Sequence, residues 1–90
     1  MVSYTLAHEI GHAVDLTYLN SAERQTWKVA RGIDPSVAWW AGSGVSDYAS
    51  GSGDWAESFA VWQVGGAGLS QLAGQPTSGQ LELMAALSAS

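Results

Sequence analysis

Two histidines four residues apart, with a glutamate directly after the first, constrain this chain more than any other feature. His8, Glu9 and His12 form the pattern H-E-x-x-H. In an α-helix, residues i and i+4 lie one turn apart on the same face, so both imidazoles can point at one ion. Tetrahedral Zn²⁺ accepts such nitrogen ligands. The pattern therefore predicts a helix that carries two zinc ligands.

Glu9 predicts the chemistry that the metal would serve. On a helix it projects about 100° around the axis from His8, beside the metal rather than on it. A carboxylate there can take a proton from a water that the metal polarises. H-E-x-x-H on a helix is typical of metalloproteases. We therefore expect a zinc-dependent hydrolase that acts on peptide bonds of a peptide or protein substrate, with Glu9 as general base.

Length and charge limit the other classes of protein. Ninety residues make a single domain over residues 1–90, and the absence of cysteine excludes disulfides. Eight acidic residues against three basic ones give a net charge of −5, which argues against nucleic acid or an anionic membrane as partner. Charged residues make up only 12%, against about a quarter in free-standing domains. We expect a piece of a larger catalytic domain, with the missing part as a partner.

The pattern of apolar and helix-ending residues predicts a mostly α fold of about four helices with little or no sheet. The expected helices cover residues 3–19, 22–31 and 54–64 and a segment after residue 78. Asp54 is the expected N-cap of the third helix. A long Gly/Ser-rich loop, from about residue 35 to 53, is expected to lie over the metal site.

For each of the first two helices, the sequence predicts which residues face the core or the solvent. In the first, an apolar stripe is expected to face the core: Leu6, Ile10, Ala13, Val14 and Thr17. Gly11 costs about 1 kcal/mol against alanine inside a helix, so we expect another backbone to pass close to it. In the second, Arg24, Lys28 and Arg31 are expected to form one solvated face near the helix C-terminus.

A catalytic zinc needs a third protein ligand. The metzincin pattern would place a glycine and a histidine three and six residues after His12, but Asp15 and Tyr18 stand there. The remaining carboxylate candidates are Asp15, Asp47, Asp54, Glu57 and Glu82.

Three segments together resemble a known family. They are residues 8–15 (HEIGHAVD), residues 46–49 (SDYA) and residues 54–60 (DWAESFA). Over residues 6–62 the chain is similar to gluzincin zinc metallopeptidases related to the catalytic domain of anthrax lethal factor. The resemblance implies a small zincin-like helical catalytic subdomain. It also implies roles for five residues: zinc ligation by His8, His12 and Glu57, the general base for Glu9, and oxyanion stabilisation for Tyr48.

Several alternatives stay open at this point. Glu57 could instead complete a capping box with Asp54, and Tyr48 could simply pack. Asp15 is expected to accept a hydrogen bond from a metal-bound histidine, because such histidines usually donate their other N–H to a carboxylate or carbonyl. The alternative function is a non-catalytic zinc-stabilised binding module, or an inactive remnant of such a peptidase.

Overall fold

The computed structural model describes residues 3–89, and these form four α-helices and one short 3₁₀ helix. In chain order they are α1 (Tyr4–Tyr18), α2 (Ser21–Arg31), η1 (Asp47–Ala49), α3 (Gly51–Val64) and α4 (Ser78–Ser88). No strand occurs between residues 3 and 89, so the predicted mostly α fold of about four helices is confirmed. Within that range no helix is long and apolar enough to cross a membrane.

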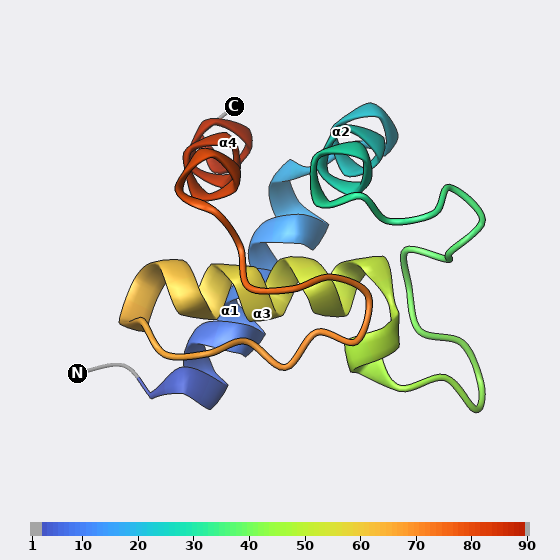
Figure 1. Cartoon of the computed structure of the whole chain (residues 1–90), viewed down its shortest axis with the longest axis horizontal. Helices are drawn as coiled ribbons and strands as arrows, with labels where there is room; N and C mark the ends of the chain where they lie inside the picture. The colour runs from blue at the N-terminus through green and yellow to red at the C-terminus, as the bar shows by residue number, and fades with distance from the viewer. Residues whose placement is uncertain (1–2, 90) are drawn as a thin grey trace.

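Helices α1 and α3 cross in direct contact and form the base of the molecule, with α2 and α4 together on one side of them (Figure 1). A Cβ atom on Gly11 would lie 3.0 Å from the Cα of Ala56 and 2.9 Å from the Cβ of Phe59. The indole N–H of Trp55 donates to the Gly11 carbonyl at 3.0 Å. The expectation that another backbone passes close to Gly11 is therefore confirmed.

The core lies between these two helices and the α2–α4 pair. It is built from large apolar side chains of α2, α3 and α4, of the residue that follows α1 and of the loop after α2: Leu19, Trp27, Trp39, Trp55, Phe59 and Met84. Trp27 and Trp55 are fully buried and meet edge to face, with ring centroids 5.1 Å apart. This geometry is the one that aromatic pairs prefer, and it fixes α2 against α3.

The predicted core face of α1 is wrong for four of its five residues; only Val14 is partly buried and packs against the core. Leu6 is 51% exposed and Ile10 is 39% exposed. The buried residues are instead those of the neighbouring row: Ala7, His8, Gly11 and Asp15. Neighbouring rows of side chains on one helix lie only about 100° apart around its axis. The row with Ala7 and Gly11 faces α3, because its small residues allow α3 to approach closely.

The predicted start of the third helix is also wrong. Helix α3 begins at Gly51, with Ser50 as N-cap: the Ser50 hydroxyl accepts from the Gly53 N–H at 3.0 Å. Asp54 is therefore an interior, fully buried position, so it does not cap the helix. The Asp54–Glu57 capping box consequently does not form.

Glycines in the first turn of α3 are required by packing rather than by loop flexibility. A Cβ on Gly51 would lie 2.6 Å from the ring of Trp39, and one on Gly53 would lie 1.7 Å from the carbonyl oxygen of Asp47. Glycine is a poor helix former, so the sequence indicated a loop here. Tertiary contacts outweigh that preference.

The solvated basic face predicted for α2 is wrong: even the Arg24 side chain is only 14% exposed and pairs with Asp15 at 2.8 Å. Lys28 and Arg31 are buried. Arg31 pairs with the Asp54 carboxylate at 2.8 Å, and the Lys28 ammonium donates to two backbone carbonyls of the following loop, at 2.6 and 3.0 Å. Burial is tolerated because each cation has found hydrogen-bond acceptors.

Candidate metal centre

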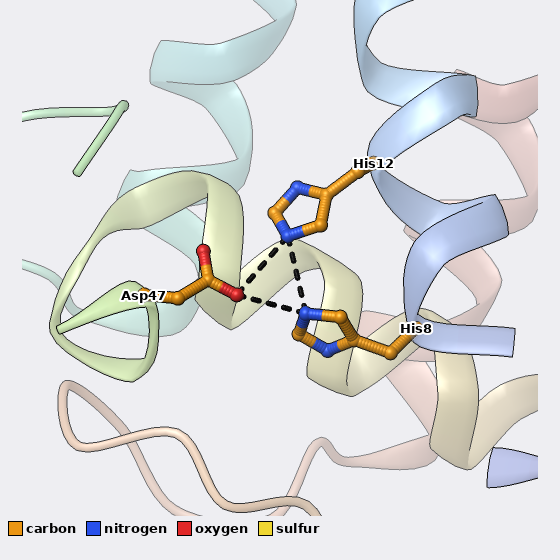
Figure 2. Close-up of side chains that lie close together, drawn as sticks. All are labelled: His8, His12 and Asp47. Carbon is orange, nitrogen blue, oxygen red and sulfur yellow. Dashed lines mark hydrogen bonds and ion pairs between the residues drawn. The ribbon is translucent and has the colours of Figure 1, made fainter. Parts of the chain in front are cut away.

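Two imidazole nitrogens and one carboxylate oxygen meet at a single point between α1 and η1. The Nε2 atoms of His8 and His12 lie 3.1 Å apart, and the Asp47 Oδ2 lies 2.8 Å from the first and 3.1 Å from the second. Figure 2 shows both rings projecting from α1 toward the Asp47 side chain. These three atoms form the one group of potential metal ligands found in residues 3–89.

Local structure fixes both sides of this cluster. On α1, the helical period places His12 one turn after His8, as the sequence predicted. On the other side, the Ser46 hydroxyl caps the 3₁₀ turn by accepting from the Tyr48 N–H at 3.2 Å. The Asp47 carbonyl accepts from both the N–H and the hydroxyl of Ser50, at 3.1 and 2.8 Å. Asp47 is therefore held by its backbone while its side chain reaches α1.

Glu57 contacts the opposite side of the His8 ring. Its Oε2 lies 2.6 Å from His8 Nδ1, and its Oε1 accepts from the Tyr4 hydroxyl at 3.0 Å and from the Leu69 N–H at 2.6 Å. The carboxylate is buried and does not point into the cluster. A carboxylate on the second nitrogen of a histidine is the usual outer partner of a metal-bound imidazole. The structure thus puts Asp47, and not Glu57, beside the two Nε2 atoms.

The protonation pattern of His8 makes the cluster attractive to a cation. A ring nitrogen 2.6 Å from a carboxylate oxygen carries its proton toward that oxygen. In the neutral tautomer the His8 Nε2 then presents a lone pair to Asp47 Oδ2, which is also an acceptor. Two acceptors at 2.8 Å repel each other unless a proton or a cation lies between them. The arrangement is therefore balanced only with positive charge in the cluster.

The Asp47 carboxylate is ionised over the ordinary pH range. Burial acts to raise its pKa, but the hydrogen bonds and charges of His12 and His8 outweigh burial and lower the pKa below its ordinary value of 3.8. The ionised form is the one that binds metal.

A pocket of about 350 Å³ opens beside His8, and its lining includes Glu9 and Tyr48, for which the resemblance implies catalytic roles. Glu9 is 66% exposed at its side chain, and its Oε1 lies 3.9 Å from His8 Nε2. The Tyr48 ring lies with its centroid 6.1 Å from that of His8. The lining also includes Tyr4, Thr5, Ser46, Asp47, Glu57 and Leu69.

Asp15 lies away from the histidine cluster although it shares their helix. It is buried, and its two oxygens accept from the Arg24 Nε and the Trp39 Nε1, each at 2.8 Å. In this structure it joins α1 to α2 and to the following loop. The outer carboxylate that contacts a histidine is Glu57.

Sequence reasoning included Asp47 among five candidates but did not single it out, and it missed Tyr4. The sequence around Asp47 did contain a local signal for a turn at the site, because a serine that can cap the turn precedes Asp47 and a tyrosine follows it. For Tyr4 there was none, since its partner Glu57 is 53 residues away.

Comparison of the chain with protein-family models, with curated proteins and with solved structures gives no match. The resemblance to gluzincins therefore rests on the three motifs alone. Arguments about function must come from the geometry of the site.

Proposed function

We propose that this protein binds one Zn²⁺ through His8, His12 and Asp47 and hydrolyses peptide bonds in a peptide or protein substrate. The observation that carries the proposal is the convergence of two imidazole nitrogens and one carboxylate oxygen within 3.1 Å of one another. Three protein ligands of these types, with a further position left open, are characteristic of catalytic zinc.

The donor atoms fit the ion in type and nearly in spacing. Zinc bonds of about 2.0–2.2 Å in a tetrahedron separate neighbouring ligand atoms by about 3.3–3.6 Å. The observed separations are 2.8 to 3.1 Å, so each pair of ligand atoms needs to move apart by about 0.2–0.8 Å. The Asp47 side chain is 40% exposed and lies at the pocket, which leaves room for water and substrate.

A bound zinc ion supplies Lewis acidity, which brings the pKa of a water toward about 7 and polarises a carbonyl. Glu9 takes the proton of the attacking water and passes it to the leaving amine. Its position in the pocket beside His8, without a place in the cluster, suits this role. Tyr48 lines the same pocket, where its hydroxyl can donate to the carbonyl oxygen as negative charge develops.

A second function is favoured by one specific observation. The three candidate ligands join α1 to η1, at the end of the long segment between α2 and α3. A metal there would stabilise the fold even without catalysis. A zinc-stabilised binding module would need the same ligands, but it would not need Glu9.

Elemental analysis of the purified protein tests metal binding first. We expect about one Zn²⁺ per chain in the parent and loss of that zinc in Asp47→Asn, because three ligands are needed. Glu57→Gln is the matched variant: it should retain zinc with lower affinity. Loss of zinc in Glu57→Gln with retention in Asp47→Asn would instead make Glu57 the third ligand, and a folded parent without zinc would refute the proposal.

Catalysis is tested on the zinc-loaded parent and on Glu9→Gln. We expect the parent to cleave members of a mixed peptide library, with cleavage products identified by mass spectrometry. Glu9→Gln should bind zinc normally and lose cleavage, because it removes the base and not a ligand. Normal zinc content with no cleavage by either protein would support the binding module.

A further inference from the structure

Tyr4 occupies a place at the pocket that the proposed chemistry does not use. Its half-buried hydroxyl donates to Glu57 Oε1 at 3.0 Å, and Glu57 Oε2 in turn contacts His8 Nδ1 at 2.6 Å. The chain of contacts therefore runs from Tyr4 through Glu57 and across the His8 ring to the Nε2 atom that faces Asp47.

Glu57 depends on neutral donors for its buried charge. In residues 3–89 no arginine or lysine contacts it; its partners are the Tyr4 O–H, the Leu69 N–H and the His8 Nδ1. A buried carboxylate keeps one orientation only while its acceptor sites are satisfied. Tyr4 and Leu69 both hold Oε1, which leaves Oε2 directed at His8.

Tyr4 can act as a donor throughout the working pH range. Burial is the main cause that raises its pKa, and the hydrogen bond and charge of Glu57 raise it further. The phenol therefore stays protonated, with its O–H aimed at the carboxylate. Of the two groups that hold Oε1, Tyr4 is the one that a side-chain substitution can remove, because the other is a backbone N–H.

We propose that Tyr4 is a positioning residue of the metal centre, which holds Glu57 so that His8 carries its proton on Nδ1 and directs the Nε2 lone pair at His12 and Asp47. Its link to zinc rests on the proposed function, but its effect on His8 does not. Outer partners of metal-bound histidines typically change metal affinity about 10- to 100-fold when they are removed. Tyr4 acts one bond further out, so its effect lies at the lower end of that range.

Zinc affinity is measured by competition with a chromogenic chelator. The proteins are the parent, Tyr4→Phe, Glu57→Gln and their double variant, with Tyr18→Phe as control because Tyr18 is an exposed tyrosine at the far end of the same helix. We expect Tyr4→Phe to weaken zinc binding about 10-fold, Tyr18→Phe to bind as the parent does, and Tyr4→Phe to add little once Glu57→Gln is present. Parent-like affinity in Tyr4→Phe, or an undiminished loss in the double variant, would overturn the proposal.

Nitrogen-15 NMR of the metal-free proteins tests the same proposal without zinc. In the parent, we expect His8 to be a single tautomer with a slowly exchanging proton on Nδ1. In Tyr4→Phe, that proton should exchange faster and the two tautomers should mix, while Tyr18→Phe should match the parent. An unchanged His8 spectrum in Tyr4→Phe would refute the positioning role. If the parent shows the expected tautomer and yet binds no zinc, the proposed function fails and the positioning role stands.

Discussion

Two buried carboxylates on α3 lie three residues apart and have opposite characters. Asp54 faces the α2–α4 side, where both of its oxygens accept from the Arg31 guanidinium at 2.8 and 3.0 Å. Glu57 faces α1 and meets a histidine instead of an arginine. Arginine is always charged and can only donate hydrogen bonds. Histidine has a second nitrogen, and the His8 Nε2 faces His12 and Asp47.

The Asp54 network is closed. Its carboxylate also accepts from Trp27 Nε1 at 3.0 Å and from the Ser70 hydroxyl at 2.7 Å, and Arg31 donates onward to Gln80 at 2.9 Å. These bonds join α2, α3 and α4 to one another and to the segment before α4 that contains Ser70. Each Asp54 oxygen accepts two hydrogen bonds and Arg31 donates four, and a buried polar network stabilises a fold when its groups are satisfied in this way.

The largest expected effect comes from breaking this closed network. Arg31→Met leaves Asp54 as a buried, uncompensated charge, and such changes cost about 3–5 kcal/mol. Urea unfolding followed by tryptophan fluorescence measures the loss. Gln25→Met, at an exposed position of the same helix, is the control and should show no resolvable change. An Arg31→Met protein as stable as the parent would mean that the network adds nothing to stability.

Zinc bound to His8, His12 and Asp47 should stabilise the fold by an amount comparable to that of the Asp54 network. This amount depends on the zinc concentration. An ion that binds only the folded state adds about 2.7 kcal/mol when its free concentration is 100 times Kd. We expect the thermal midpoint of the parent to rise on zinc addition and to return on chelation. Asp47→Asn should show no such rise, since it lacks the third ligand. An equal rise in both proteins would place the zinc elsewhere.

Replacement of Gly53 by alanine should lower stability by a smaller amount and should also weaken zinc binding. A Cβ there would meet the Asp47 carbonyl at 1.7 Å, so Gly53→Ala must displace η1. Overpacking of this kind costs about 1–3 kcal/mol, and the displaced Asp47 should bind zinc poorly. The matched control is Gly42→Ala, where a Cβ meets nothing within 4 Å. Normal zinc binding by Gly53→Ala would contradict the assignment of Asp47 as ligand.

The smallest expected effect is the part of the pH dependence of stability that Asp47 contributes, measured with a chelator present. Its folded-state pKa lies below the ordinary value of 3.8. Its contribution to stability is therefore complete above pH 3.8 and is lost as pH falls through the lower folded pKa. The difference in stability between the parent and Asp47→Asn should shrink as the pH is lowered below 4. A difference that grows on acidification would reverse the assigned direction of the shift.

Local patterns in the chain predicted the elements that depend on neighbours in sequence. The spacing of His8 and His12 required only the helical period, and the expected range 22–31 agrees with α2 to within one residue. They failed where a distant segment decided the outcome. The exposed Leu6 and Ile10 have the same helical period as the buried row, so periodicity alone could not choose between the two faces.

The sequence by itself therefore determined a helical chain with two histidines presented on one face and a glutamate beside them. Only the tertiary structure decided which carboxylates join them. Asp47 reaches the histidines because the glycine at position 53 lets η1 pack against α3. Glu57 turns to His8 Nδ1 because Tyr4 and Leu69 hold its other oxygen. Contacts of this kind join residues 12 to 53 positions apart, beyond the reach of any local pattern.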